Sequence, residues 1–176
     1  MGPLTLEIMK NALTRLDQIL DRPVTLIMGG GGAMILAHGF PKGTTDIDAI
    51  PKGIEINELD PLVKKLAKEL NLPYDWINPY YSTFSHTLPG DYGSRLITVF
   101  SGNHLKVEAL SRQEMLIMKC FAHRQKDIPH AKALVRAGVD IEAVEARIQE
   151  LEKKKIRHAT EALDFLQDIL DQVDGE

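Results

Sequence analysis

Two short stretches decide the fold, and they read Val24-Thr25-Leu26-Ile27-Met28-Gly29-Gly30-Gly31-Gly32-Ala33-Met34 and Thr44-Thr45-Asp46-Ile47-Asp48-Ala49-Ile50. Residues 24–28 are apolar and rich in β-branched side chains, and four glycines follow them, so we predict a buried strand that ends in a tight turn. A short helix is expected over residues 32–38. Residues 45–50 alternate polar and apolar side chains, so a strand there places both aspartates on one face.

The spacing of the two aspartates points to a divalent cation. Carboxylates at positions i and i+2 of a strand project side by side, and their repulsion is relieved by a cation such as Mg²⁺ or Mn²⁺. Magnesium keeps coordination positions open for phosphate oxygens, and glycines let the backbone approach phosphates closely. The pattern therefore predicts a nucleoside triphosphate site, with Asp46 and Asp48 as catalytic metal ligands and with nucleotide contacts from Gly30, Gly31, Gly32 and Thr45.

Other glycine motifs do not fit this turn. A dinucleotide fingerprint needs a glycine at its sixth position, where a count from Gly29 or Gly30 reaches Met34 or Ile35. A P-loop needs a Gly-Lys-Ser/Thr triplet, and the chain has none. A plain turn beside an exposed acidic strand remains the alternative without function.

The two motifs resemble the signature of the nucleotidyltransferase (polymerase-β-like) superfamily, a Gly-Gly or Gly-Ser turn, a helix and an Asp-x-Asp strand. More narrowly, residues 20–137 resemble small bacterial nucleotidyltransferases related to the type IV toxins of abortive-infection systems. In that group a helix carries a lysine followed by Arg-x-x-Asp, which here are Lys119 and Arg124-Gln125-Lys126-Asp127. The resemblance implies a catalytic, phosphate-binding role for Lys119 and nucleotide contacts from Arg124 and Asp127.

The lysine also stands out from the residues alone. Lys119 interrupts an apolar run, and a lysine is seldom buried without an anion. Helical spacing would stack it with Arg112, His123 and Lys126 in a basic stripe that meets phosphate oxygens. A lysine that extends from a core helix to solvent is the alternative. Asp127 is interpreted as an N-cap of the next helix, as a member of the site, or as both.

Three positions depart from the family pattern. The third carboxylate that often joins the metal pair is best matched by Glu108, a glutamate where aspartate is usual; a solvent-facing partner for Lys106 is the alternative. Relatives often have an aspartate where this chain has His130, and the serine usual near the glycine turn is absent.

The rest of the chain predicts helices over residues 4–20 and 56–70, a strand over 74–77, a long polar and aromatic loop over 78–94, and a hairpin of strands 95–100 and 104–110. Ser111 and Glu114 fit a capping box, so a helix is expected from there to about residue 125. Another helix follows Asp127, and Asp140 caps a last, long helical stretch to Val173. We expect an α/β (α+β) fold: a small mixed sheet flanked by helices in a core over residues 1–110, and a C-terminal helical portion over 111–176.

Composition narrows the class of protein. The 176 residues carry a net charge of -4, yet residues 106–136 hold 7 Lys and Arg against 3 Asp and Glu. This suits a compact anionic ligand such as a nucleotide, or a short stretch of nucleic acid, and a solvated helix face is the alternative. The single cysteine, Cys120, permits no internal disulfide and no thiolate zinc site. With no apolar run long enough for a bilayer and no signal-peptide pattern, we expect a cytoplasmic protein without membrane contact.

These observations together predict a metal-dependent nucleotidyltransferase that moves a nucleotidyl group from an NTP to a hydroxyl of an RNA, a protein or a small molecule. The toxin resemblance adds a toxin–antitoxin role, with a cognate antitoxin or a second copy of the chain as partner. The alternative is a non-catalytic nucleotide- or partner-binding module on the same fold, antitoxin-like or regulatory. A dinucleotide-dependent enzyme is a third interpretation, and it predicts stabilisation by NAD.

Overall fold

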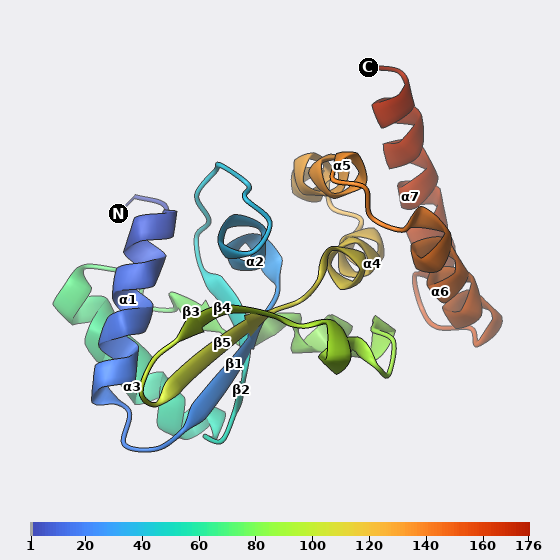
Figure 1. Ribbon diagram of the computed structural model, residues 1–176. Helices are drawn as coiled ribbons and strands as arrows, with labels where there is room; N and C mark the ends of the chain where they lie inside the picture. The colour runs from blue at the N-terminus through green and yellow to red at the C-terminus, as the bar shows by residue number, and fades with distance from the viewer. Residues whose placement is uncertain (1) are drawn as a thin grey trace. The chain divides into compact units, whose positions relative to one another are not determined.

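The computed structural model describes residues 2–176, and the side chains of all of these except residues 80–83 (Figure 1). The chain divides into two compact units. The first runs to Ser82 and includes Leu96–Leu110; the second consists of Thr83–Arg95 and Ser111–Glu176. Each unit is described by itself.

The first unit is a mixed α/β structure, as the sequence predicts. Its elements are α1 (Leu6–Ile19), β1 (Val24–Met28), α2 (Gly30–Leu36), β2 (Ile47–Lys52), α3 (Ile56–Leu70), β3 (Ile77–Asn78), β4 (Ile97–Ser101) and β5 (Leu105–Ala109). The predicted bounds of β1 and α3 are confirmed, whereas α2 begins two residues earlier and β2 two residues later than expected. A shift of two residues leaves the same side chains of β2 on the same face.

The five strands form one sheet in the order β3-β2-β1-β5-β4 (Figure 1). Strand β1 pairs antiparallel with β2 and parallel with β5, and the β4–β5 hairpin is antiparallel, as predicted. Met28 is aligned with Ala49 of β2 and with Ala109 of β5. The C-terminal ends of β1 and β5 and the N-terminal end of β2 therefore lie next to one another, beside the glycine turn.

One face of this sheet forms the core of the unit. Leu26, Met28, Ile47, Ala49 and Val107 are fully buried on it. Burying each large aliphatic side chain contributes about 1.5–3 kcal/mol to folding. The residues that alternate with these, among them the two aspartates, project from the opposite face.

A buried carboxylate joins α1 to the hairpin, a contact that the helical pattern of residues 4–20 does not reveal. The Asp17 carboxylate accepts backbone N–H groups of Asn103 at 3.1 Å, His104 at 2.7 Å and Leu105 at 2.8 Å. Burial raises the pKa of Asp17, but the three backbone hydrogen bonds outweigh it and lower the pKa below its usual value. A Cβ on Gly102 would lie 2.3 Å from the Asp17 carboxyl carbon, so this turn needs glycine.

The second unit is helical. It contains α4 (Arg112–Ala122), α5 (Ile128–Arg136), α6 (Ile141–Lys153) and α7 (Ala159–Asp174), with a 3₁₀ turn at Gln125–Asp127. Helix α7 contacts α4, α5 and α6. No helix of the described residues combines the length and the apolar character that crossing a bilayer requires.

The segment predicted as a loop over residues 78–94 contains two 3₁₀ helices, Tyr80–Thr87 and Tyr92–Arg95. From Thr83 onward it belongs to the helical unit. Arg147 of α6 donates to the carbonyl oxygens of Thr87 at 3.0 Å and Leu88 at 2.7 Å, and Arg95 donates to the buried Glu114 of α4 at 2.8 Å. Contacts to distant helices, which a local pattern does not report, give this segment its structure.

Helix α4 begins after Ser111, as predicted, but the predicted capping box does not form and the predicted last helix is interrupted. Ser111 is the N-cap of α4, but its side chain does not cap the helix; its hydroxyl donates to the Glu114 carboxylate, which also binds Arg95. The last helical stretch is not continuous, because it breaks between α6 and α7, where Lys155 and His158 have φ of 56° and 68°. The cap by Asp140 is confirmed, at 3.0 Å from its carboxylate to the N–H of Ala143.

Candidate functional site

The glycine turn lies directly against Asp48. Gly30, the first residue of α2, has φ of 59°, and a Cβ there would lie 2.0 Å from Oδ2 of Asp48. The N–H of Gly29 also donates to the carbonyl oxygen of Asp48 at 2.9 Å. Both the left-handed backbone and the close approach require glycine at position 30. The chain thus places its glycine turn and its Asp-x-Asp strand in contact.

Asp46 and Asp48 lie on the same face at the start of β2, and both are half-buried. We call these two residues the acidic strand end. The Asp46 carboxylate accepts a hydrogen bond from Nδ2 of Asn78 at 2.5 Å, and Asn78 is aligned with Asp48 in the β2–β3 pairing. The amide of Asn78 therefore fixes the orientation of Asp46.

No sequence pattern points to the role of Asn78. It begins the segment that was predicted as a loop, and β3 is only two residues long. Its position depends on parallel pairing with β2, a contact between segments about thirty residues apart in the chain.

The acidic strand end offers ligands of the kind that Mg²⁺ prefers. Two carboxylates and a neighbouring amide supply hard oxygen atoms, and all three side chains are half-buried. The fit of these residues to a divalent cation rests on this donor set and on the adjoining glycine turn.

Glu108 lies on the same face of the sheet. It is aligned with Ile27 of β1, which is aligned in turn with Ile50, two residues after Asp48. Its carboxylate pairs with Lys106 at 2.6 Å. Among the described residues no three His, Cys, Asp or Glu side chains are grouped as a metal site. A metal-binding role for Glu108 stays a prediction.

The remaining predicted nucleotide contacts of the first unit lie near the same turn. Gly31 and Gly32 are in the first turn of α2, and a Cβ on Gly32 would lie 3.1 Å from the Met28 side chain. Thr45 is exposed, with its hydroxyl 3.4 Å from Oδ1 of Asp46.

Lys119, Arg124 and Asp127 form an ion-pair cluster in the second unit. Lys119 Nζ donates to Oδ1 of Asp127 at 2.5 Å, and Arg124 Nε donates to Oδ2 at 2.6 Å. The side chains of Lys119 and Asp127 are 6% and 2% exposed, whereas that of Arg124 is 48% exposed. Burial raises the pKa of Asp127, but the charges of Lys119 and Arg124 outweigh it and hold the pKa below its usual value.

This geometry resolves the interpretations of Asp127. Asp127 is the N-cap residue of α5, as predicted, but its side chain makes no capping hydrogen bond and binds Lys119 and Arg124 instead. The anion that Lys119 needs inside its apolar helix is a carboxylate of the same unit. The cluster holds two cations and one carboxylate and keeps an excess positive charge.

The predicted basic stripe does not form along one helix. Helix α4 ends at Ala122, His123 turns out of it with φ of 35°, and Lys126 lies in the following 3₁₀ turn. Arg112 donates instead to the carbonyl oxygen of Ala137 at 3.2 Å. The stripe assumed a helix to residue 125, and the left-handed residue at 123 ends it earlier.

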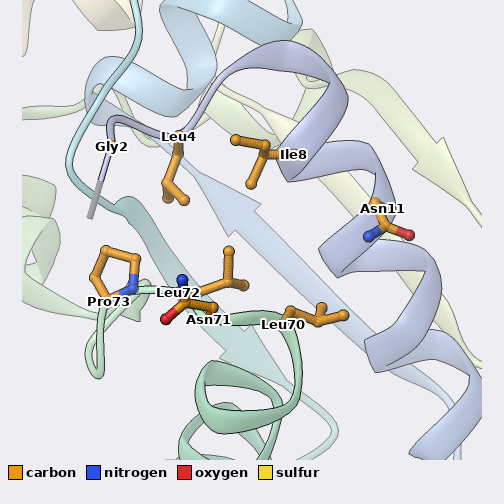
Figure 2. A pocket seen from close by; sticks show the side chains of 8 residues that line it. All are labelled: Gly2, Leu4, Ile8, Asn11, Leu70, Asn71, Leu72 and Pro73. Atoms are coloured by element: carbon orange, nitrogen blue, oxygen red, sulfur yellow. The ribbon is translucent and has the colours of Figure 1, made fainter.

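Figure 2 shows a different hollow of the first unit, lined by the start of α1 and the end of α3. Its lining residues, Gly2, Leu4, Ile8, Asn11 and residues 70–73, carry no charge. A triphosphate needs cations or a bound metal, which this hollow lacks among its lining side chains. The chemistry of the described residues is therefore concentrated at the acidic strand end and in the ion-pair cluster.

Comparison with known proteins identifies the family of the chain. The model of a family described as nucleotidyltransferases of unknown function (DUF6036) matches residues 5–169. No curated protein and no solved structure matches the chain. The matched range includes the glycine turn, the acidic strand end and the ion-pair cluster, and a nucleotidyltransferase takes the group it transfers from a nucleoside triphosphate. The chain belongs to the DUF6036 family of nucleotidyltransferases.

Proposed function

We propose that this protein transfers a nucleotidyl group from an NTP to a hydroxyl acceptor in a magnesium-dependent reaction. The observation that carries the proposal is the contact between the glycine turn and the Asp-x-Asp strand, in which the Asp48 carboxylate occupies the space that a side chain at Gly30 would fill. Two carboxylates on one face, directly beside a bare backbone turn, suit a cation that bridges protein and phosphate oxygens.

Each residue of the acidic strand end has a defined task in this proposal. Asp46 and Asp48 would hold the metal, and the hydrogen bond from the amide of Asn78 fixes the orientation of the Asp46 carboxylate. A bound Mg²⁺ supplies charge neutralisation at the triphosphate and lowers the pKa of a coordinated hydroxyl. Gly30 has no side chain, so the Asp48 carboxylate can lie directly against the turn.

The ion-pair cluster provides the phosphate contacts in the second unit. Arg124 keeps half of its side chain exposed while Asp127 holds its Nε, so its remaining guanidinium N–H groups are available to an anion. Lys119 acts mainly through its charge, because it is nearly fully buried against Asp127. From the sequence resemblance, we propose that Arg124 binds phosphate oxygens and that Lys119 compensates the charge of Asp127.

The acceptor is a hydroxyl of an RNA, a protein or a small molecule. A toxin role with a cognate antitoxin is part of this proposal, on the basis of the sequence resemblance to abortive-infection nucleotidyltransferases. Induced expression in bacterial cells should arrest growth if the role is correct. An Asp48→Asn variant expressed at the same level should not arrest it.

Pyrophosphate release tests the reaction directly. The protein is incubated with Mg²⁺ and each labelled NTP, together with total RNA or with lysate protein as the acceptor. We expect Asp46→Asn and Asp48→Asn each to lower the rate by about 100-fold or more, since each removes a charge that neutralises the transferring group. The matched control is Asp75→Asn, the same chemical change at an exposed position.

Full activity of both variants would refute the metal pair. Binding of Mg-NTP by the wild-type protein without transfer to any acceptor would favour the non-catalytic module in its place.

A further inference from the structure

Two basic segments of the helical unit lie side by side although they are distant in the sequence. Residues 123–126 read His-Arg-Gln-Lys, and residues 153–158 read Lys-Lys-Lys-Ile-Arg-His with no acidic residue among them. The rings of His123 and His158 join the segments, with centroids 5.3 Å apart and an angle of 48° between their planes. We call these two segments the basic surface.

The charges of the basic surface are largely uncompensated. Lys154 pairs with Glu150 at 2.5 Å, Arg124 pairs with Asp127, and Nδ1 of His158 lies 3.4 Å from a carboxylate oxygen of Glu161. Among the residues whose side chains are described, no carboxylate lies within ion-pairing distance of Lys126, Lys153, Lys155 or Arg157, all of which are exposed. Four exposed cations on two segments that the His123 and His158 rings join, in a chain with a net charge of -4, fit an anionic partner.

The backbone at this place is also unusual. In the described residues four non-glycine residues have a positive φ, and three of them, His123, Lys155 and His158, belong to the basic surface. A left-handed conformation costs an L-residue with a side chain about 1–2 kcal/mol, and such residues gather at functional sites. The conformation holds the two histidine rings and the lysines at the protein surface.

We propose that the basic surface binds the phosphate backbone of RNA, which makes RNA the acceptor class; this choice of acceptor rests on the proposed nucleotidyl transfer. Arginine and lysine contact phosphates, and histidine rings stack on unpaired bases. A membrane fits less well, because the exposed large hydrophobic side chains of the described residues all lie outside residues 123–158. Arg124 belongs both to this surface and to the ion-pair cluster, so an RNA bound here reaches the residue assigned to the triphosphate.

The test is fluorescence anisotropy with a 5′-fluorescein RNA hairpin that carries a single-stranded 3′ end, measured at several salt concentrations. The test variant is Lys153→Gln/Lys155→Asn/Arg157→Gln, with asparagine at 155 because it tolerates a left-handed backbone. The control is Lys10→Gln/Lys65→Gln/Lys68→Gln, three exposed lysines of the first unit with the same change in charge. Thermal melts verify that both variants are folded.

We expect the test variant to weaken RNA binding by about 10-fold or more and to reduce the slope of log Kd against log salt by about 2–3, since each lost phosphate contact removes about one. The control should stay within about twofold of the wild type. Equal losses in both variants, no loss in the test variant, or binding to phosphatidylserine vesicles in place of RNA would overturn the proposal.

The two proposals fail separately. RNA binding retained by wild type and by Asp48→Asn, without transfer from any NTP, would leave the RNA surface standing and refute the reaction. Transfer from an NTP to a protein or a small molecule, without RNA binding, would support the reaction and refute the RNA surface.

Discussion

The acidic strand end and the ion-pair cluster hold their charges in opposite ways. At the strand end two carboxylates of like charge lie on one face, and Asp46 is oriented by the neutral amide of Asn78. In the cluster the buried Asp127 is neutralised by cations on both of its oxygens. Removing a charge should therefore destabilise the cluster and leave the strand end as stable or more stable. This contrast distinguishes a group kept for a ligand from a group kept for the fold.

The strongest test of the contrast is Lys119→Met. The substitution keeps the apolar stem and leaves Asp127 buried with only Arg124 as its partner, so we expect the free energy of unfolding to fall by about 3 kcal/mol. Urea denaturation measures the change, and the exposed Lys126→Met should alter stability by less than about 0.5 kcal/mol. Wild-type stability in Lys119→Met would contradict the structural role.

The same variant tests the phosphate role when it is melted with and without Mg-NTP. Because Lys119 is proposed to compensate the charge of Asp127, its loss should also reduce the shift in Tm that Mg-NTP produces. An unchanged shift together with a lower Tm would assign Lys119 to the fold alone.

Gly30→Ala measures how closely the turn and the strand end are joined. The added Cβ meets Oδ2 of Asp48 at 2.0 Å and adopts φ of 59°, so we expect a loss of about 2 kcal/mol or more. Gly39→Ala is the matched control, since Gly39 has φ of 69° and nothing lies within 4 Å of a Cβ there. Gly39→Ala should lower the free energy of unfolding by only about 1 kcal/mol, which is the cost of a left-handed backbone at a residue with a side chain. Equal costs for the two variants would show that Asp48 moves away freely.

The pH dependence of stability distinguishes the contribution of the buried Asp127 carboxylate from that of exposed carboxylates. The pKa of Asp127 is lower in the folded protein than in the unfolded chain. Its contribution is therefore fully present above the unfolded value of about 3.9 and is lost as pH falls through the folded value. Between pH 5 and 3, as order-of-magnitude bounds, chemical denaturation should show a smaller stability loss in Asp127→Asn than in the wild type. Identical pH profiles would exclude the ion pair as a source of acid sensitivity.

The smallest expected effect is at the strand end itself. In the absence of metal, Asp46→Asn removes one of two neighbouring like charges and should leave Tm unchanged or slightly higher, within about 0.5 kcal/mol. Calorimetry in EDTA measures it, and added Mg²⁺ should stabilise the wild type more than the variant. A large loss of stability in EDTA would mean that Asp46 serves the fold through Asn78.

Much of the first unit was predictable because its signals are local. The run 24–28 with its glycines, the alternation that sets Asp46 and Asp48 apart from Ile47 and Ala49, and the periodicity of 56–70 each report a structure formed within a few residues. The ends of the helices were less predictable. Ser111 and Glu114 have the spacing of a capping box, but Arg95, which is distant in the sequence, binds Glu114. Such competition between partners is invisible to a local motif.

The sequence by itself determined the mixed α/β class, the pairing of a glycine turn with an Asp-x-Asp strand, and the need of Lys119 for an anion, because hydrophobic periodicity and burial costs act locally. Only the tertiary structure decided that the anion is Asp127, that Asn78 orients Asp46, and that residues 123–126 meet 153–158. The distance between these segments in space cannot be deduced from their separation along the chain. Packing of apolar faces, which is not specific to any one polar pair, brings them together.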